Sequence, residues 1–227
     1  NDKGSVAAFM TAAKAIATSG LPLKGDLVLA AVCGEIERAP VDEYQGIEYL
    51  GFGFGTRHLL TYGVLTDMAI VAEPCQSENS QFGVTWGLPG GLYLKISCFG
   101  FPLYAPYTRR DAGQNAVATA ARVIEAIEEW GTAFEAANRY EFENGVIIPK
   151  VNLGAIRGGL PYKPNYSPGV CKLYVDIRVP PQRDPLDVMQ EVKEALDRLR
   201  LKYGYHLEVY RSQRGYHVPY ERVASLV

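Results

Sequence analysis

The sequence predicts an α/β protein whose first unit is interrupted by a second unit of β-α-β-β-α-β order. Residues 27–32 and 68–72 form unbroken apolar runs, which indicate strands covered on both faces and so a largely parallel sheet. From about residue 90 onward, apolar and polar residues alternate, as in strands with one solvent-exposed face. This change of pattern indicates two architectures in one chain.

The first unit begins with a predicted helix and continues into a long connection. Apolar residues recur every three or four positions over residues 5–18, and Gly20 can end this helix in the left-handed conformation. Residues 37–56 contain the sequence Gly-Phe-Gly-Phe-Gly and are predicted to be a packed surface loop. They are not a dinucleotide-binding fingerprint, because they do not directly follow a strand and Thr56 and Arg57 stand where the third glycine is needed.

The second unit has the element order of a ferredoxin-like fold, with one open sheet and two helices on one face. Its second helix has Asp184 as the expected N-cap, Pro185 in the first turn and Gly204 beyond its end. The alternating and helical patterns place strands and helices at residues 92–98 (strand), 115–130 (helix), 146–153 (strand), 172–179 (strand), 184–199 (helix) and 206–210 (strand).

Composition and charge exclude several classes of protein. The 23 Lys and Arg residues against 25 Asp and Glu residues leave a net charge of −2, without the basic excess that nucleic-acid binding requires. The longest apolar run, residues 27–33, is too short to span a membrane. The chain starts with Asn rather than Met and has no signal peptide, so we expect its true beginning to be missing, with a processed N-terminus as the alternative.

The four cysteines are Cys33, Cys75, Cys98 and Cys171, and none of them forms a C-x-x-C pair. A structural zinc knot is therefore not expected. Cys33 and Cys98 lie in apolar runs and are predicted to be buried thiols. Reduced cysteines fit a cytoplasmic protein, although the cysteine count alone does not decide the compartment.

A set of motifs, in order along almost the whole chain, resembles the zinc-dependent acetylornithine deacetylase and succinyl-diaminopimelate desuccinylase family of metallopeptidases. The resemblance implies a partial metal-binding α/β core of the zinc-exopeptidase kind, with an inserted ferredoxin-like lid that also dimerises. It places the partial catalytic domain at residues 1–87, the lid at 88–213, and a return to the catalytic domain at 214–227. The motifs are N-D-K-G-S-V-A-A-F (1–9), G-D-L-V-L-A-A-V-C-G-E-I-E (25–37), A-E-P (72–74), G-x-N-A (113–116), G-G-L-P-Y-K-P-N-Y-S-P (158–168) and V-D-I-R (175–178).

In the core, the resemblance implies a general base and metal ligands. Glu35 occupies the position of the general base that takes a proton from a metal-bound water, although a solvated strand-end carboxylate is the alternative. Glu73 matches a metal carboxylate. The bridging Asp of the family is replaced by Asn1, with Asp2 following as the candidate ligand, and the family's second carboxylate is replaced by Ile36, which cannot bind metal.

In the lid, the resemblance implies that Asn165 and Arg178 contact substrate, because an arginine fork matches a carboxylate. An ion pair between Arg178 and Asp176 is the alternative. The family's lid histidine, which reaches across the dimer, is absent, and Tyr104 or Tyr107 could donate a hydroxyl instead. We assign Asn115 to capping the following helix rather than to substrate.

The family's outermost histidine ligands would lie before residue 1 and after residue 227, and His58, His206 and His217 match neither of them. We therefore expect zinc (or cobalt or manganese) in the full-length protein, but no catalytic zinc and no activity in this 227-residue chain. Because half of the covering sheet is not in the sequence, Leu29 and Val71 should lose part of their burial.

Two hypotheses of function follow. The first is a metal-dependent amidohydrolase that cleaves an N-acyl amino acid or peptide-like amide beside a free carboxylate. The second is a catalytically degenerate binding or scaffold protein on the same fold, which Asn1 and Ile36 favour. The expected partners are a small-molecule substrate with a free carboxylate and a second copy of the chain, paired through the lid, with no nucleic acid and no membrane.

Overall fold

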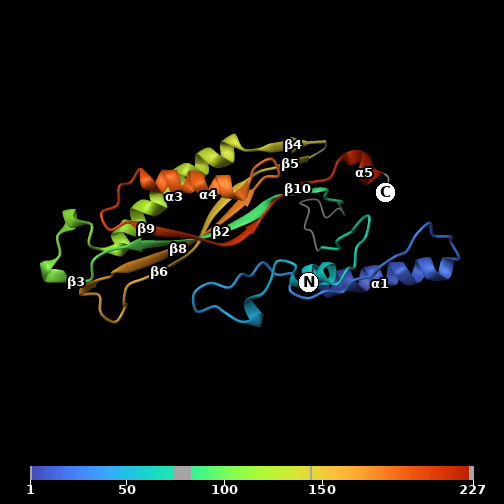
Figure 1. The fold of residues 1–227 in the computed structure, drawn as a ribbon, viewed down its shortest axis with the longest axis horizontal. Coiled ribbons are helices and arrows are strands. Elements are labelled where there is room, and N and C mark those ends of the chain that lie inside the picture. Colours follow the sequence, from blue (N-terminus) through green and yellow to red (C-terminus); the bar gives the residue numbers. More distant parts are fainter. Residues whose placement is uncertain (1, 74–82, 144, 225–227) are drawn as a thin grey trace. The chain divides into compact units, whose positions relative to one another are not determined.

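The computed structural model describes residues 2–73, 83–143 and 145–224, and the chain divides into two compact units, Asn1–Val84 and Thr85–Val227 (Figure 1). The domain limits expected from the motifs, at residues 87/88 and 213/214, stay a prediction. None of the helices in the described part of the chain is both long and apolar enough to cross a membrane.

The first unit contains helix α1 (Asp2–Ser19), the short 3-10 helix η1 (Ile47–Tyr49) and helix α2 (Phe54–Thr61). Helix α1 confirms the predicted helix, and Gly20 has a φ of 71°, the left-handed conformation expected at its end. The segment 37–56, predicted to be a loop, is partly helical, because it includes η1 and the first turn of α2.

The two predicted buried strands of the first unit are absent, which corrects the sequence-based interpretation. Residues 27–32 and 68–72 form no strand, and Leu29 and Val71 are 45% and 78% exposed, which agrees with the reduced burial predicted for them. A strand needs a hydrogen-bonded neighbour, and the one bridge among the described residues of this unit joins Val41 to Tyr44. Cys33, predicted to be buried, is exposed for the same reason.

The second unit confirms the β-α-β-β-α-β order. Four antiparallel strands lie in the order β6-β8-β2-β9, so each helix crosses over to a non-adjacent strand, as in the ferredoxin-like fold. The elements of this fold, in chain order, are β2 (Gly90–Phe99), α3 (Ala116–Ala137), β6 (Lys150–Gly158), β8 (Val170–Val179), α4 (Pro185–Asp197) and β9 (Tyr205–Gln213).

The predicted strand at residues 146–153 is two strands instead of one. Strand β5 (Gly145–Ile147) forms a hairpin with β4 (Tyr140–Phe142), and β6 begins only after Pro149. Proline has no backbone N–H to donate, so it interrupts a strand at the point where the chain changes its pairing partner.

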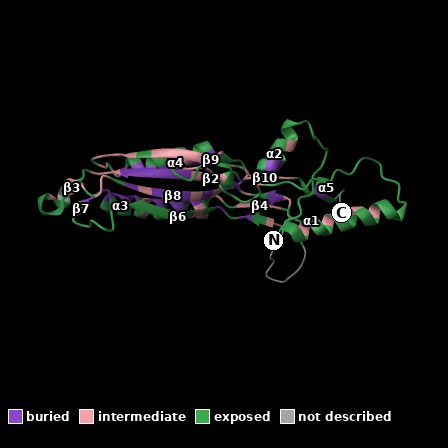
Figure 2. Cartoon of the chain, turned by 90° about the horizontal axis from the view of Figure 1, so that it is seen from below, coloured by how far each residue is buried: buried purple, intermediate pink, exposed green. Residues whose placement is uncertain are grey.

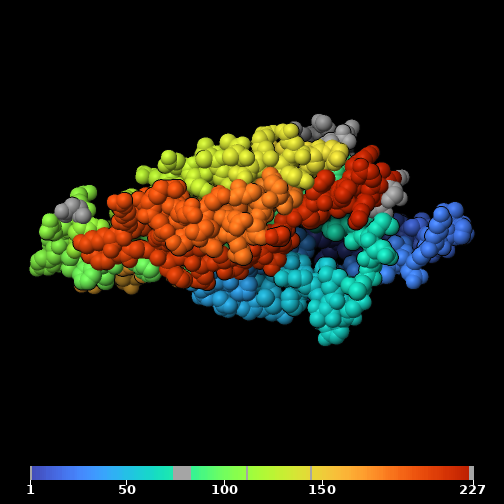
Figure 3. Space-filling model, turned by 45° about the horizontal axis from the view of Figure 1, so that its top comes forward, coloured from blue at the N-terminus to red at the C-terminus, as the bar shows by residue number. Residues whose placement is uncertain are grey.

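The core of this unit lies between the sheet and the two helices, α3 and α4, which pack side by side on one face (Figure 3). The central strands β2 and β8 are the most deeply buried parts of the chain (Figure 2). The fully buried side chains with the largest volumes are Leu92, Leu94, Ile96, Ile127, Leu173, Ile177, Leu196, Val123, Val175, Val179, Val188 and Val192.

Local chemistry sets where both helices begin. The side chain of Asn115 accepts hydrogen bonds from Val117 N at 2.9 Å and Ala118 N at 3.3 Å, so it caps α3 as predicted. Asp184 caps α4 in the same way, because its carboxylate accepts from Leu186 N at 2.9 Å. Both N-caps were predicted from the sequence and are confirmed.

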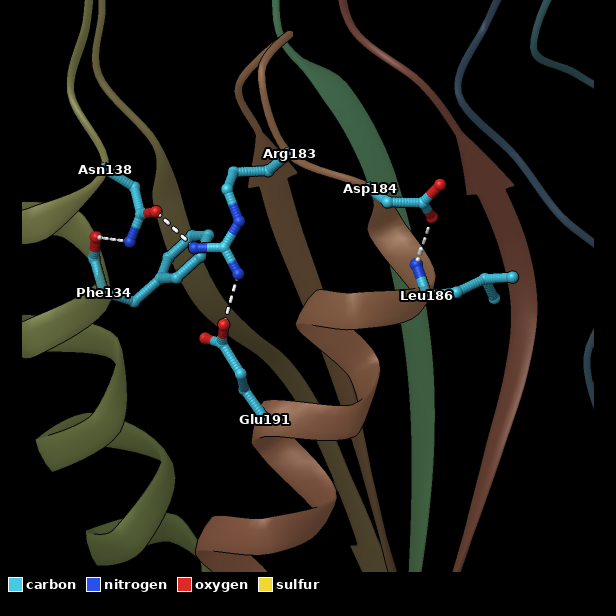
Figure 4. A network of polar contacts seen from close by, with 6 residues as sticks. All are labelled: Phe134, Asn138, Arg183, Asp184, Leu186 and Glu191. Carbon is cyan, nitrogen blue, oxygen red and sulfur yellow. Dashed lines mark hydrogen bonds and ion pairs between the residues drawn. The ribbon is translucent and has the colours of Figure 1, made fainter.

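A polar network ties the two helices together near the start of α4 (Figure 4). The Arg183 guanidinium donates to Asn138 Oδ1, at the end of α3, and to the Glu191 carboxylate on α4. It also lies over the Phe134 ring, with its central carbon 5.9 Å from the ring centroid. This arginine therefore contacts both helices at once and fixes their spacing.

Shorter elements surround the sheet. Strand β1 (Gly87–Leu88) pairs with β10 (Tyr216–His217), where the chain enters and leaves the ferredoxin-like fold, and α5 (Tyr220–Ala224) follows. Strand β3 (Leu103–Tyr104) pairs with β7 (Tyr166–Ser167) beyond the other end of β2 and β8. Two 3-10 helices, η2 (Ala105–Tyr107) and η3 (Arg110–Ala112), connect β3 to α3.

Candidate functional site

Carboxylates gather around Glu35 in the first unit. The pKa of Glu35 is raised, first by desolvation and then by the negative charges of Glu73, Asp2 and Glu37. The charges of Glu73 and Asp2, the other two residues proposed for the core, thus act on the Glu35 carboxyl. Asn1, the other candidate for the bridging position, lies outside the described residues.

The glycine-rich segment holds the backbone that carries Glu35. Gly53 N donates to Gly34 O at 2.9 Å, and Gly55 N donates to Cys33 O at 2.9 Å. A Cβ added at Gly55 would lie 2.6 Å from Cys33 O, and one added at Gly51 would lie 1.8 Å from Ile36 O. Only glycine allows these backbones to approach so closely.

Sequence reasoning missed this role of the glycines. The alternating Gly-Phe-Gly-Phe-Gly pattern is the sequence feature that indicates it, because repeated glycines permit close backbone approach. In the structure, these glycines form the support on one side of residues 33–36, and α2 begins within them, at Phe54. They are positioning residues for Glu35.

The carboxylates proposed as ligands are of a chemical type that binds a divalent metal, but there are too few of them. Carboxylate oxygens are acceptable zinc ligands, and clustered negative charge favours a cation. However, the described residues contain no group of three or more His, Cys, Asp or Glu side chains that could hold a metal. The described part of this chain therefore does not provide a complete metal centre by itself.

The two residues predicted for the lid have different surroundings. The Arg178 guanidinium is paired with Asp176, with both Nε and Nη2 2.9 Å from Asp176 Oδ2. This ion pair is the alternative that the sequence left open for Arg178. Asn165 has an exposed side chain, and its backbone oxygen accepts a hydrogen bond from Ala105 N at 2.8 Å.

Asn165 and Arg178 lie at opposite ends of strand β8. Arg178 is near the last residue of β8 and lies opposite Gly91 of β2. Asn165 comes just before β7, and β7 is followed by the first residue of β8, Val170. Eight strand residues at about 3.3 Å each separate the two ends by roughly 26 Å. The structure therefore does not bring these two residues together, and one lid cannot place both of them on one small substrate.

The three histidines have different surroundings. His58 lies in α2, with its ring centroid 4.5 Å from that of Tyr62. His206 is exposed on strand β9. His217 is largely buried in the second unit, where its Nδ1 is 3.2 Å from the Tyr140 hydroxyl.

Comparison with known proteins identifies the second unit. Residues 109–204 match the family described as peptidase dimerisation domain (M20_dimer). These residues run from the connection before α3 to the end of the α4 region, so they include both helices and, between them, the sheet strands β6 and β8. This part of the second unit is therefore similar to a peptidase dimerisation domain.

Two solved structures are similar to part of this chain at low identity. An amidase of the hydantoinase/carbamoylase family from Burkholderia vietnamiensis is 19% identical, with a TM-score of 0.48, and the match covers 62% of this chain and 32% of that one. The aminobenzoyl-glutamate utilization protein from Klebsiella pneumoniae is 17% identical, with a TM-score of 0.42 and coverage of 60% and 34%. The match thus spans about a third of the length of each relative.

The class follows from the domain match and the motif order together. The ferredoxin-like unit of this chain resembles the M20 peptidase dimerisation domain, which confirms the predicted resemblance and fold class. The particular subgroup predicted from the motifs, the acetylornithine deacetylase and desuccinylase enzymes, stays a prediction.

Proposed function

We propose that this chain is part of a metal-dependent hydrolase that cleaves the amide of an N-acyl amino acid or peptide-like substrate, in the manner of a deacetylase or desuccinylase. The observation that carries the proposal is the acidic neighbourhood of Glu35 in a chain that also contains a peptidase dimerisation domain. Partial desolvation and the charges of Glu73, Asp2 and Glu37 raise the pKa of Glu35, which is the direction expected of a carboxylate that acts as a general base.

Each residue has a distinct role in this proposal. Glu35 accepts the proton of the attacking water and returns it to the leaving amine. Glu73 and Asp2 would contribute carboxylates to zinc, or to cobalt or manganese, in the full-length protein, and such a metal would supply Lewis-acid polarisation of the amide carbonyl. Asn165 and Arg178 would contact the substrate and its free carboxylate.

The dimerisation domain supports a homodimer. Strand β6 is an edge of the sheet with an exposed face, and edge strands can pair with a second copy. In such a dimer, Asn165 and Arg178 could serve different active sites, which accounts for their positions at opposite ends of β8. Sedimentation should show a dimer at micromolar concentration, and a monomer throughout would contradict this part of the proposal. A cytoplasmic location also remains a proposal.

The second candidate is a catalytically degenerate binding or scaffold protein on the same fold. Two observations favour it: Ile36 stands in the position of a carboxylate ligand, and the Arg178 guanidinium is engaged by Asp176. For the 227-residue chain itself, absence of catalytic zinc and of hydrolase activity remains our prediction.

The decisive assay is hydrolysis of N-acetyl amino acids by the full-length protein after reconstitution with zinc, cobalt or manganese. We expect Glu35→Gln to lower kcat by roughly 100-fold or more, because it removes the proton acceptor. Glu37→Gln is the matched control, since it removes a nearby negative charge but not the base, and it should change kcat far less. Full metal loading without turnover of any acyl amino acid or dipeptide would support the scaffold alternative.

A further inference from the structure

A cluster of tyrosines lies at the end of the second unit formed by β3 and β7, where Tyr104 is directly opposite Tyr166. The ring centroid of Tyr104 is 6.2 Å from that of Tyr166 and 6.1 Å from that of Tyr107. Lys163 Nζ lies 4.8 Å from the centroid of the Tyr166 ring. We call Tyr104, Tyr107, Tyr166 and Lys163 the tyrosine tip; strand β3, which carries Tyr104, is labelled in Figure 1.

The tyrosine tip is exposed although it is strongly aromatic. Tyr104, Tyr107 and Tyr166 are 40%, 72% and 43% exposed. Residues 101–108 and 160–167 include five aromatic side chains among sixteen positions, and Lys163 is their one charged residue. Aromatic side chains gathered on a surface mark a binding site more often than chance exposure does, and a lone cation among them favours an anionic group on the ligand.

Backbone hydrogen bonds hold the tip in a defined shape. Ala105 N donates to Asn165 O at 2.8 Å, joining the two segments, and Thr108 Oγ1 donates to Ala105 O at 2.8 Å. Lys163 N donates to Leu160 O at 2.8 Å, which closes the turn that presents the cation. These hydrogen bonds hold the two segments that carry the rings in one conformation, so less conformational entropy is lost when a ligand binds.

We infer that the tyrosine tip is a binding site for a small molecule that carries both an aromatic ring and a carboxylate, the ring packing on Tyr104 and Tyr166 and the carboxylate meeting Lys163. This inference rests on the proposed function in taking that molecule to be the amide substrate, since the tip adjoins Asn165. It narrows the substrate class to N-acyl amino acids with an aromatic acyl group or side chain. Aromatic pairs prefer offset or edge-to-face geometry, and a carboxylate forms a charge-assisted contact with an ammonium group.

The test compares three ligands that differ by one group each. N-acetylphenylalanine has the ring and the carboxylate, N-acetylalanine lacks the ring, and N-acetylphenylalaninamide lacks the carboxylate. Titration calorimetry with the 227-residue chain should give N-acetylphenylalanine the lowest Kd. Loss of the ring or of the carboxylate should each raise Kd by roughly 3- to 10-fold.

Substitutions in the tyrosine tip test whether the differences in Kd arise there. Tyr166→Ala should remove the advantage of the ring, and Lys163→Met should remove the advantage of the carboxylate while keeping most of the apolar stem. Tyr216→Ala, which removes an exposed tyrosine of β10 outside the tip, is the matched control and should leave the preference unchanged.

The outcomes separate this inference from the proposed function. If the full-length protein hydrolyses N-acetylalanine and N-acetylphenylalanine equally well and Tyr166→Ala changes neither KM, the inference fails and the hydrolase proposal stands. If the chain binds N-acetylphenylalanine at the tip but the metal-loaded full-length protein hydrolyses no amide, the site stands and the hydrolase proposal fails. Absence of binding to the chain, or a change in oligomeric state with Tyr166→Ala and no change in ligand affinity, would overturn the inference.

Discussion

Similar apolar segments are buried in one unit of this chain and exposed in the other. In the second unit, Leu94 on β2 and Leu173 on β8 are fully buried between a hydrogen-bonded sheet and two helices. In the first unit, residues 27–32 are as apolar, yet Leu29 is 45% exposed and no strand forms. Apolar character therefore does not bury a segment by itself; a paired neighbour and a covering layer must also be present.

The same contrast separates the helices. Helix α1 has no buried residue, whereas α3 buries seven, including Ala120, Val123 and Ile127. The cysteines of the two units differ in the same way. Cys98 and Cys171, in the second unit, are paired across β2 and β8 and are buried, while Cys33, in the first unit, is exposed. Burial raises the pKa of Cys98 to about 12, so its thiol stays protonated and unreactive at physiological pH.

The largest expected effect comes from truncating a leucine in each unit. Leu94→Ala should lower the free energy of unfolding by about 2–5 kcal/mol, because it leaves a cavity in a closed core. Leu29→Ala should change it by less than about 0.5 kcal/mol, since the side chain is already half in solvent. Urea unfolding followed by far-ultraviolet circular dichroism measures both changes. Equal changes in the free energy of unfolding for the two variants would contradict the difference in burial between the two units.

A smaller effect is expected at the N-cap of α3. Asn115→Ala removes the acceptor for two backbone N–H groups and should lower the free energy of unfolding by about 1 kcal/mol. Asn115→Ser can still accept one of these bonds and should restore most of the stability. Thermal unfolding of the two variants checks this, and a cost for serine equal to that for alanine would show that Asn115 acts through something other than capping.

The smallest effect concerns Glu135, which joins α3 to the edge strand β6. Its carboxylate accepts from Lys150 Nζ at 2.6 Å and from Val151 N at 2.9 Å, and the Lys150 hydrogen bond is the main cause that lowers the pKa of Glu135 below the usual 4.5. Glu135→Gln should cost under about 1 kcal/mol near neutral pH, because the pair is partly solvated.

The pH dependence of this cost has a definite sign. A folded-state pKa below the unfolded value means that the charged form stabilises the fold above pH 4.5, and that this stability is lost as the pH falls through the lowered value. The difference in urea midpoint between the wild type and Glu135→Gln should therefore shrink on going from about pH 7 to about pH 3. Glu128→Gln, about two turns earlier on α3, is the control, and a difference that grows in acid would contradict the assignment.

Much of the second unit could be predicted from the sequence because its signals are local. Alternation along β8 is preserved in its burial, and the caps at Asn115 and Asp184 depend only on residues two or three positions away. The split at Pro149 was missed, although proline is a local signal, because the apolar residues continue on both sides of it.

The candidate site was less predictable because it depends on contacts between distant segments. The sequence indicated Glu35, Glu73 and Asp2 as separate candidates, and only the fold indicates that the charges of Glu73 and Asp2 raise the pKa of Glu35. It could not show that Gly51 and Gly55 support the backbone around Glu35, since that requires two loops to approach more closely than any Cβ allows.

By itself, the sequence determined the β-α-β-β-α-β order, the helix caps and the motif order, because periodicity, capping and turn chemistry act over a few residues. Only the tertiary structure decided which apolar runs are buried, that Arg178 pairs with Asp176, and that Asn165 lies with the tyrosines at the far end of β8. These outcomes depend on which strands find a hydrogen-bonded partner and on the length of the strand between two side chains, and neither can be read from neighbouring residues.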